Sequence, residues 1–422
     1  MFGLDSQQAQ RRSGPRGKYD MLMLLALIGL ASLGVVMITS SSIAVADSDH
    51  MGAFYYLKRH LVFLALGLTM AVVAMRTELK LLEKNAFPLM MLAVALLLLV
   101  LVPGVGARIN GARRWLHLAG ITFQPVEAVK LVLVVYMASY LIRHRVSVET
   151  TFWGLLKPIM VAGMFVLLLL AQPDFGSATL VIAVTIAMVW FGGARPLYLM
   201  LMGLPLMPAL VYAATSESYR MKRLTSFTNP WADPFKDGFQ LTQSLMAIGR
   251  GEWTGVGLGS SVLKLSYLPE AHSDFIFAVI AEELGLLGVL AVIGLFALAV
   301  GRGLYLGLRG VQAGERFAGF VAFGLSLMLG LQTLVSIGVN LGALPTKGLT
   351  LPLISYGGSS TMLTCALAGV LLRATWEINR KIDDRNQRAT MSAADLAALA
   401  ATGTQPVAVA AKDARERGVK VA

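Results

Sequence analysis

The residues best suited to chemistry are charged side chains that stand at the edges of long apolar stretches. Asp274 lies in LPEAHSDFIFAVIAEELG, directly before an apolar run and close to Glu270 and His272. Partial burial at the edge of a membrane can raise the pKa of a carboxyl group towards that of a useful base. An acid at the start of a helix can also act only through the helix dipole, with Ser273 as the N-cap. The segment predicts a general base or a helix-start acid.

Two basic clusters fall on the same predicted side of the membrane as Asp274. They consist of Arg108, Arg113 and Arg114, and of Arg220, Lys222 and Arg223. Arg and Lys are natural partners of phosphate oxygens, so one interpretation is recognition of an anionic headgroup. The other is simple attraction to the charged lipid surface.

Three more charged residues lie at the ends of apolar runs. Glu127 and Lys130 are three residues apart after Pro125, so they share a helix face and can pair. This pair is either a structural salt bridge or part of an outer cavity. Asp174, in QPDFGSA, either lines the same cavity or caps the following helix. Glu282 and Glu283 lie deeper in an apolar run, where a polar bridge between helices and a chemical role both fit.

The segment LPTKGLTLPLISYGGSS joins the last two apolar runs and contains Lys347, Ser355 and Gly357. Its two prolines and its glycines predict irregular backbone at membrane depth. Such backbone is tolerated only where it is buried in protein or lines a cavity. The residues alone therefore predict one outer cavity that suits an anionic lipid, without separating an enzyme from a transporter.

The composition indicates that membrane-spanning segments position these residues. Of 422 residues, 56% are hydrophobic and only 14% are charged. A soluble protein has about a quarter of its residues charged, and a hydrocarbon core of about 30 Å needs about 20 apolar residues to cross it. The single cysteine, Cys365, excludes an intrachain disulfide and a cysteine metal site. No motif for ATP or nicotinamide binding is present, and neither a metal site nor a nucleic-acid partner is expected.

The apolar runs predict an all-α polytopic membrane protein with ten transmembrane helices. The predicted spans are 20–43, 61–75, 87–103, 126–142, 155–171, 177–191, 196–214, 274–300, 317–341 and 359–376. With the amino terminus inside, 23 of the 36 Lys and Arg residues fall on the cytoplasmic side and 13 outside, as the positive-inside rule requires. Both termini are therefore expected in the cytoplasm.

The domain organisation follows from these spans. We expect a cytoplasmic segment at 1–19, a membrane domain at 20–378 and a disordered cytoplasmic tail at 379–422. The long external loop 216–271 contains aromatic and apolar patches, and short amphipathic helices on the membrane surface are expected there. A cleaved signal peptide at the amino terminus is the alternative for the first span, but its apolar stretch is too long.

Several segments together resemble one family. They are LTSFTNPWADPF, GFQLTQSLMAIGRGEWTGVGLGSS, LKLSYLPEAHSDFIFAVIAEELG, LPTKGLTLPLISYGGSS, GARRWLHLAGITFQPVEAVKL and AQPDFGSA. They resemble the SEDS family (shape, elongation, division and sporulation), the ten-span peptidoglycan glycosyltransferases. LPEAH and the threonine- and lysine-containing segment after it are similar to the cell-division members rather than the elongation members. Ser336 departs from the family pattern, where Asn is expected, which puts a polar contact near the cavity in doubt.

The resemblance implies an enzyme that polymerises lipid II into glycan strands during septal cell-wall synthesis, in the bacterial inner membrane at the division septum. Asp274 matches the essential aspartate of the family. The implied partners are a class B penicillin-binding protein, the septal transpeptidase of the FtsI type, and other divisome membrane proteins. The candidate substrate-binding residues are Arg220, Arg223, Lys347, Trp115, Arg114, Glu127, Lys130, Asp174, Ser355 and Gly357.

Two other functions fit the same features, namely a lipid II flippase and a non-catalytic divisome scaffold. A flippase should carry charged or broken-helix features through to the inner face, whereas here only Glu282 and Glu283 extend inward. The enzyme is therefore the leading hypothesis. No cofactor is assigned, and a requirement for a divalent cation, Mg²⁺ or Mn²⁺, is left open.

Overall fold

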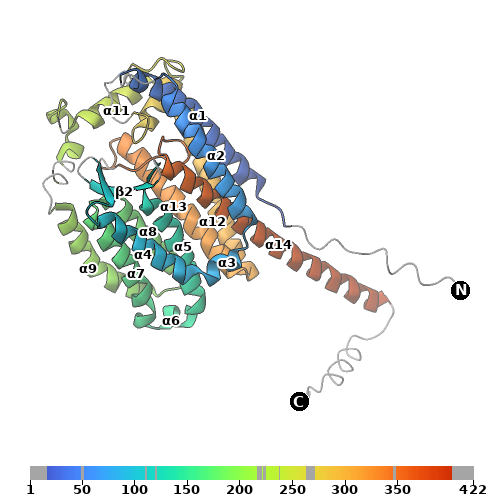
Figure 1. Ribbon diagram of the computed structural model, residues 1–422. Helices are drawn as coiled ribbons and strands as arrows, with labels where there is room; N and C mark the ends of the chain where they lie inside the picture. Colours follow the sequence, from blue (N-terminus) through green and yellow to red (C-terminus); the bar gives the residue numbers. More distant parts are fainter. Residues whose placement is uncertain are drawn as a thin grey trace.

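The computed structural model describes residues 17–48, 52–109, 112–118, 121–215, 221, 225–236, 238–262, 271–345 and 348–401. The chain is a helical bundle with one small sheet (Figure 1). The longer helices are α1 (Met21–Ser48), α2 (Tyr55–Arg76), α4 (Ala86–Leu101), α5 (Pro125–Arg143), α7 (Phe152–Ala171), α8 (Phe175–Phe191), α9 (Pro196–Thr215), α11 (Phe239–Arg250), α12 (Ile276–Ala313), α13 (Arg316–Asn340) and α14 (Ser359–Ala401). The short ones are α3 (Leu79–Lys84), α6 (Arg145–Thr150) and the 3-10 helix η1 (Pro230–Ala232).

A helix occupies each of the ten predicted spans, which confirms the all-α fold. Seven helices in the described part of the chain are long and apolar enough to cross a membrane: α1, α2, α5, α7, α12, α13 and α14. The helices α4 and α8 are shorter but apolar, and α9 fills the seventh predicted span. The number of ten crossings therefore stays a prediction.

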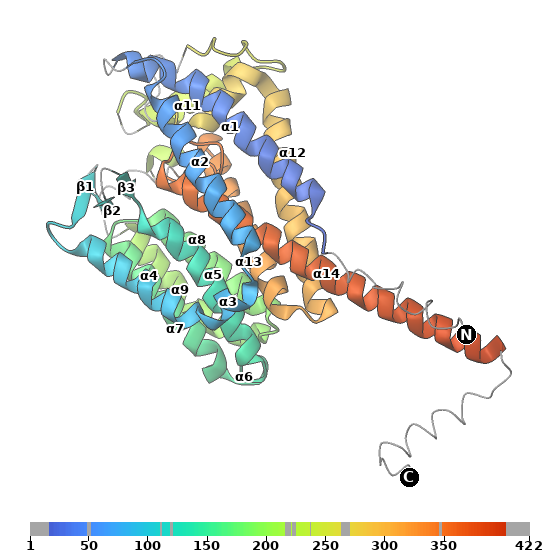
Figure 2. The ribbon, with the colours of Figure 1, turned by 45° about the vertical axis from the view of Figure 1, so that its right-hand side comes forward.

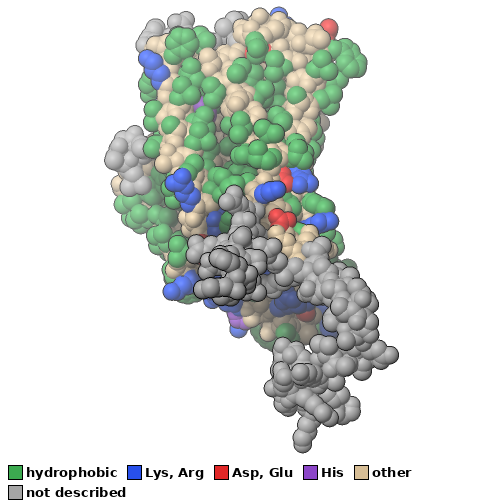
Figure 3. Space-filling view, turned by 90° about the vertical axis from the view of Figure 1, so that its right-hand side faces the viewer, with side chains coloured by type: hydrophobic (Ala, Val, Ile, Leu, Met, Phe, Trp, Pro, Cys, Tyr) green, Lys and Arg blue, Asp and Glu red, His purple; other side chains and the backbone are tan. Residues whose placement is uncertain are grey.

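The surface of the bundle has the character of a membrane protein. Large apolar side chains stay exposed along α1 and α12, for example Leu25 and Ile28 on α1 and Leu287 and Leu290 on α12. In Figure 3 hydrophobic side chains cover the upper part of one face, and charged side chains gather below them. A soluble monomer rarely exposes apolar patches of this extent, whereas lipid tails cover them without cost. The chain is a multi-pass membrane protein.

The helix α13 is the centre of the bundle. It packs against α5, α8, α12 and α14, and α14 packs along α2. The helix α1 lies against α12, while α4, α5, α7 and α8 form a neighbouring group (Figures 1 and 2). Most of the side chains on α13 are buried, although its sequence is no more apolar than that of the lipid-facing helices. This burial makes α13 the helix from which polar side chains can reach an interior site.

The structure contains a small sheet that the sequence analysis did not predict. The strands β1 (Gly106–Ile109), β2 (Ala112–Leu118) and β3 (Ile121–Phe123) pair antiparallel in the order β1-β2-β3. Ala107 faces Trp115 across the first pair. The dipeptide Asn110-Gly111 between two short runs was the available signal, because Asn-Gly favours a tight hairpin turn.

The long loop 216–271 contains one amphipathic helix among its described residues. In α11, Leu241, Thr242, Ser244 and Ala247 are buried. This buried face packs against α12 and α13. The prediction of a short amphipathic helix is confirmed, but its apolar side faces the protein, since the ends of α12 and α13 offer an apolar surface there.

The predicted disordered tail is wrong over 379–401, because α14 continues to Ala401 (Figure 1). Two contacts fasten this extension to the α12–α13 turn. Lys381 forms an ion pair with Glu315 at 3.1 Å, and Arg385 donates to the carbonyl of Gln312 at 3.3 Å. Alanine and arginine are also strong helix formers. Residues 402–422 lie outside the described part of the chain.

Candidate active site

Asp274 lies in a turn just before α12 and is half-buried. The side-chain amide of Asn340, from the end of α13, donates to the Asp274 carbonyl at 3.0 Å. The oxygen of the same amide accepts from the Ala278 backbone N–H at 3.2 Å. The N-cap position is Phe275, so the expected N-cap role of Ser273 is wrong. The Ala278 N–H also donates to the Phe275 carbonyl at 3.0 Å, so Asn340 from a neighbouring helix is its second acceptor.

The segment 348–357 is irregular backbone enclosed by protein, as predicted. Residues 351–355 are all buried. Ser355 donates from Oγ to the Ser273 carbonyl at 2.7 Å and accepts from the Leu351 N–H at 2.8 Å. The Tyr356 N–H donates to the His272 carbonyl at 2.9 Å. Ser355 therefore fastens this segment to the chain beside Asp274. Its predicted contact with the substrate stays a prediction.

Residues 348–350 lie close to Asp274, to the first turn of α8 and to Gln332 on α13. A Cβ atom built on Gly348 would lie 3.1 Å from Oδ2 of Asp274. A Cβ atom built on Gly176, in the first turn of α8, would lie 3.2 Å from Cγ of Leu349. The Thr350 carbonyl accepts from Nε2 of Gln332 at 3.0 Å. This short segment connects Asp274, the start of α8 and the middle of α13.

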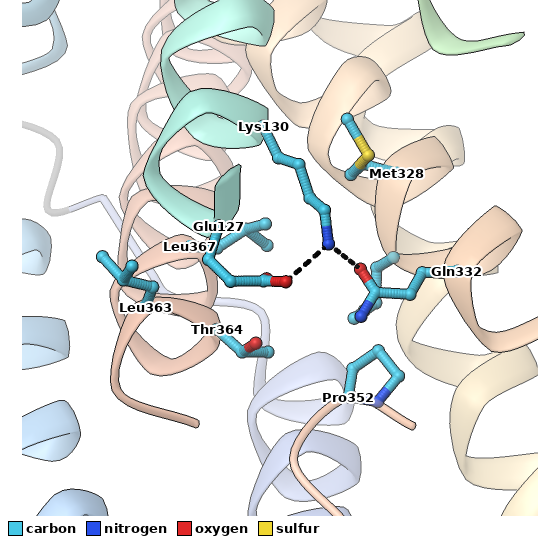
Figure 4. Close-up of a pocket in the computed structure, with 9 residues that line it drawn as sticks. Glu127, Lys130, Met328, Gln332, Pro352, Leu363, Thr364 and Leu367 are labelled. Carbon is cyan, nitrogen blue, oxygen red and sulfur yellow. Dashed lines mark hydrogen bonds and ion pairs between the residues drawn. The ribbon is translucent and has the colours of Figure 1, made fainter. Parts of the chain in front are cut away.

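Glu127 and Lys130 form the predicted ion pair, with Nζ 2.8 Å from Oε1. Lys130 is buried, with 2% of its side chain exposed, and also donates to Oε1 of Gln332 at 3.0 Å (Figure 4). The pair also lines a pocket. The other lining residues are Met328, Leu329, Gln332, Pro352, Leu363, Thr364 and Leu367. The salt-bridge interpretation is confirmed, and the pair lines this pocket. Its place in an outer substrate cavity stays a prediction.

Gln332 and Asn340 are polar residues of this site that the sequence analysis missed. Gln332 connects Lys130 to Thr350, and Asn340 holds Asp274. The sequence did contain a signal for both, because each is an amide side chain inside the apolar run 317–341, where a polar side chain needs an internal partner. Ser336, the departure from the family pattern, is buried, and its Oγ has no hydrogen-bond partner in the described structure.

The predicted residues Arg114, Trp115 and Asp174 lie around the sheet and the α7–α8 turn. Nε of Arg114 donates to the Gln172 carbonyl at 3.0 Å, and its guanidinium also contacts the Pro173 carbonyl. Trp115 is half-buried on β2. Asp174 is 5% exposed and accepts from the Ser177 N–H at 3.1 Å, so it is the N-cap of α8. The capping interpretation of Asp174 is confirmed.

We expect Asp174→Asn to leave activity and stability near those of the wild type, because Asn caps a helix as well as Asp does. Asp174→Ala should lower the free energy of unfolding by about 0.5 to 2 kcal/mol. Thermal unfolding in detergent together with an activity assay checks both variants. A large loss of activity in a stable Asn variant would show that the charge of Asp174 also serves the substrate.

The remaining predicted residues are Gly357, Arg220, Arg223 and Lys347, and the structure describes only Gly357 among them. Gly357 lies in the turn before α14, where its carbonyl accepts from the Ser360 N–H at 2.6 Å. Arg220, Arg223 and Lys347 lie outside the described residues. Lys347 directly precedes Gly348, which lies against Asp274.

Glu282 and Glu283 form a fully buried polar bridge, as one of the two interpretations predicted. Glu282 pairs with Arg250 at 3.2 Å and accepts from Ser261. Glu283 accepts from Oγ of Ser40 on α1 at 2.7 Å. The helix α12 breaks just after them, at Gly285, where φ is 65°. Only glycine adopts this conformation readily, so the break lets residues 251–257 of the long loop pack against α12.

A resident metal site is not evident among the described residues. They contain no group of three or more His, Cys, Asp or Glu side chains that could hold a metal ion. The Glu127 carboxylate in the pocket is already paired with the Lys130 ammonium group.

Comparisons with known proteins agree with this fold. Residues 20–380 match the model of the FtsW/RodA/SpoVE family, described as cell cycle proteins. The chain is 54% identical over 375 residues to "Probable peptidoglycan glycosyltransferase FtsW" of Xanthomonas oryzae pv. oryzae, covering 89% of this chain and 76% of that one. It is 45% identical over 354 residues to a protein of the same name from Hahella chejuensis, covering 84% and 89%.

Two solved structures are similar as well. One is described as "Structural coordination of polymerization and crosslinking by a peptidoglycan synthase complex", with a TM-score of 0.70 and 32% identity over 85% of this chain and 98% of that one. The other is the rod shape determining protein RodA of Thermus thermophilus, with a TM-score of 0.62 and 30% identity over 85% and 96%. The resemblance seen in the sequence is confirmed, and the chain belongs to the FtsW/RodA/SpoVE family of cell cycle proteins, the SEDS family.

Proposed function

We propose that this protein is a peptidoglycan glycosyltransferase that polymerises lipid II into glycan strands during septal wall synthesis. The observation that carries the proposal is the position of residues 348–350. They connect the half-buried carboxylate of Asp274 to a pocket whose wall holds Lys130 and Glu127. The names of the relatives, peptidoglycan glycosyltransferase FtsW, support the same activity.

The proposed reaction is an inverting displacement. The 4-hydroxyl oxygen of the acceptor sugar attacks the anomeric carbon of the donor, and a new C–O bond forms. The bond between that carbon and the diphosphate oxygen breaks, and the diphosphate leaves with the electron pair. Asp274 takes the proton of the attacking hydroxyl. A glycosidase needs a second carboxyl group to protonate its leaving oxygen, but a diphosphate leaves without a proton, so one acid is enough.

The test of this function is polymer synthesis by the purified protein. We expect the protein, together with its transpeptidase partner, to convert labelled lipid II in detergent into glycan polymer seen on a gel. Failure to make polymer, combined with movement of lipid II across proteoliposome membranes, would favour the flippase. Failure of both activities would favour the scaffold. We propose no resident cofactor, and parallel reactions with EDTA and with added Mg²⁺ or Mn²⁺ test whether a divalent cation is needed.

We propose that Arg220, Arg223 and Lys347 hold the diphosphate of the substrate. The support is the position of Gly348 against Asp274, because Lys347 is its neighbour in the chain. Charge-assisted contacts are worth about 1.5 to 3 kcal/mol each, so each single Ala variant should bind or turn over lipid II about tenfold less well. Lys236→Ala, an exposed lysine of the same external loop, is the matched control. Unchanged affinity and rate in all three variants would leave only attraction to the lipid surface.

The proposed partner is a class B penicillin-binding protein, together with other divisome membrane proteins at the septum. The similar solved structure of a synthase complex that couples polymerisation with crosslinking supports a partner that crosslinks the glycan.

We propose that both termini are cytoplasmic and that residues 216–271 face outwards. Thr228 is exposed in this loop, and the one native cysteine, Cys365, is buried. Thr228→Cys should therefore react with a membrane-impermeant maleimide in intact spheroplasts, and the unmodified protein is the control. Labelling only after the inner face is made accessible would reverse the proposed orientation.

A further inference from the structure

We propose that Asn340 is a positioning residue for the reaction, because its side-chain amide fixes the backbone of Asp274. The inference rests on the proposed role of Asp274. Asn340 is fully buried at the end of α13. Its Nδ2 donates to the Asp274 carbonyl at 3.0 Å and to the Ser336 carbonyl at 2.8 Å. Its Oδ1 accepts from the Ala278 N–H at 3.2 Å.

These contacts use both hydrogens of the amide and its oxygen, so the orientation of the side chain is determined. The Asp274 contact restrains the turn before α12. The Ala278 contact gives a second acceptor to an N–H in the first turn of that helix, which also donates to the Phe275 carbonyl at 3.0 Å. Asp274 therefore has a neighbour at its backbone and another at its side chain. Asn340 holds its carbonyl from α13, and Gly348 lies against its carboxylate.

Asn340 is also connected to the external helix α11. Oγ of Ser244, which is fully buried on α11, donates to the Asn340 carbonyl at 2.8 Å. One residue therefore joins an external helix, the end of α13 and the backbone of the proposed base. A side chain used only to cap α12 would need the bond to Ala278 and nothing else. The further bond to Asp274 is what points to positioning.

Loss of this amide should affect the rate of the chemical step more than substrate binding. A general base works only within hydrogen-bond reach of the proton that it takes, and a misplacement of about 1 Å can cost about a hundredfold in rate. We therefore expect Asn340→Ala to lower kcat for labelled lipid II at least tenfold, with KM within about twofold of the wild type. A purely structural contact would instead lower the amount of folded protein and leave kcat per folded molecule unchanged.

Ser336→Ala is the matched control. Ser336 is buried one turn earlier on α13, and its hydroxyl has no hydrogen-bond partner in the described structure. The Ser336 carbonyl that Asn340 contacts remains in this variant. Ser336→Ala should retain the kcat and KM of the wild type. Size-exclusion chromatography and thermal unfolding of each variant give the folded fraction.

Asn340→Asp is the second variant, because it keeps the volume of the side chain, and kcat is expressed per folded molecule for both variants. A carboxylate keeps an acceptor for the Ala278 N–H but cannot donate to the Asp274 carbonyl. Its kcat should fall about as far as that of Asn340→Ala. Wild-type kcat in a folded Asn340→Asp or Asn340→Ala variant would overturn the inference.

Asp274→Asn, measured in parallel, separates this inference from the proposed function. If Asp274→Asn is inactive and the Asn340 variants have the kcat of the wild type, only the positioning role fails. If Asp274→Asn has the wild-type rate, the base assignment fails, and with it the reason for positioning Asp274.

Discussion

Asp274→Asn should abolish polymerisation of lipid II while leaving the protein folded. The change keeps the size of the side chain and removes only the group that can take a proton. General acid-base catalysis contributes about 10² to 10⁴ in rate, and the orientation of a base in a partly enclosed site adds to this. The backbone contact from Asn340 to the Asp274 carbonyl does not depend on the side chain. We therefore expect the Asn variant to unfold at nearly the same temperature as the wild type.

Asp274→Glu tests the position of the base separately from its chemistry. The longer side chain moves the carboxylate by about 1 Å. A displacement of this size can cost about a hundredfold, so little activity should remain. Asp233→Asn, an exposed acid of the loop 216–271, is the control and should have the wild-type rate.

The measurement is the initial rate of glycan synthesis by purified protein with its transpeptidase partner. Wild-type polymerisation by a folded, partner-bound Asp274→Asn variant would disprove the base assignment. Asp274 would then be an acid at a helix start that acts only through the helix dipole.

The ten helices could be predicted from the sequence because each is a long apolar run between charged or Pro and Gly residues. A membrane-spanning segment must be apolar, and a helix provides the hydrogen bonds that its backbone N–H and C=O groups cannot make to water inside the membrane. The sheet at 106–123 escaped because its strands are short and their apolar residues do not alternate regularly. The helical extension of α14 escaped because composition alone does not reveal contacts such as Lys381 with Glu315.

The site was predicted in its residue types more than in its contacts. The sequence identified Asp274, Lys130 and Asp174 because a charged group beside an apolar run needs a reason. The sequence could not assign the roles of these three residues, because a carboxylate that caps a helix and one that lines a cavity occupy the same kind of position in a sequence. The amides of Gln332 and Asn340 carry no charge and gave a weaker signal, although they make the contacts that connect the site.

The Lys130–Glu127 pair is expected to give the largest effect on stability. Lys130→Met leaves the Glu127 carboxylate without its cation in a largely buried place, where only 10% of its side chain is exposed. Removing one partner of a buried ion pair costs about 3 to 5 kcal/mol, because the remaining charge stays desolvated. Unfolding of the variant in detergent, by heat or by denaturant, measures this loss. A variant as stable as the wild type would mean that water reaches Glu127 and solvates it.

The double variant Glu127→Gln with Lys130→Met distinguishes a purely structural ion pair from a pair whose ammonium group also serves the substrate. It removes both charges and keeps similar volumes, so it should recover much of the lost stability. Part of the loss should remain, since Oε1 of Gln332 also loses the donor Nζ of Lys130. If the pair is only structural, polymerisation returns together with stability. If the ammonium group in the wall of the pocket also serves the substrate, the double variant stays stable and remains slow. We expect the second result, because Gln332 connects Lys130 directly to the segment that touches Asp274.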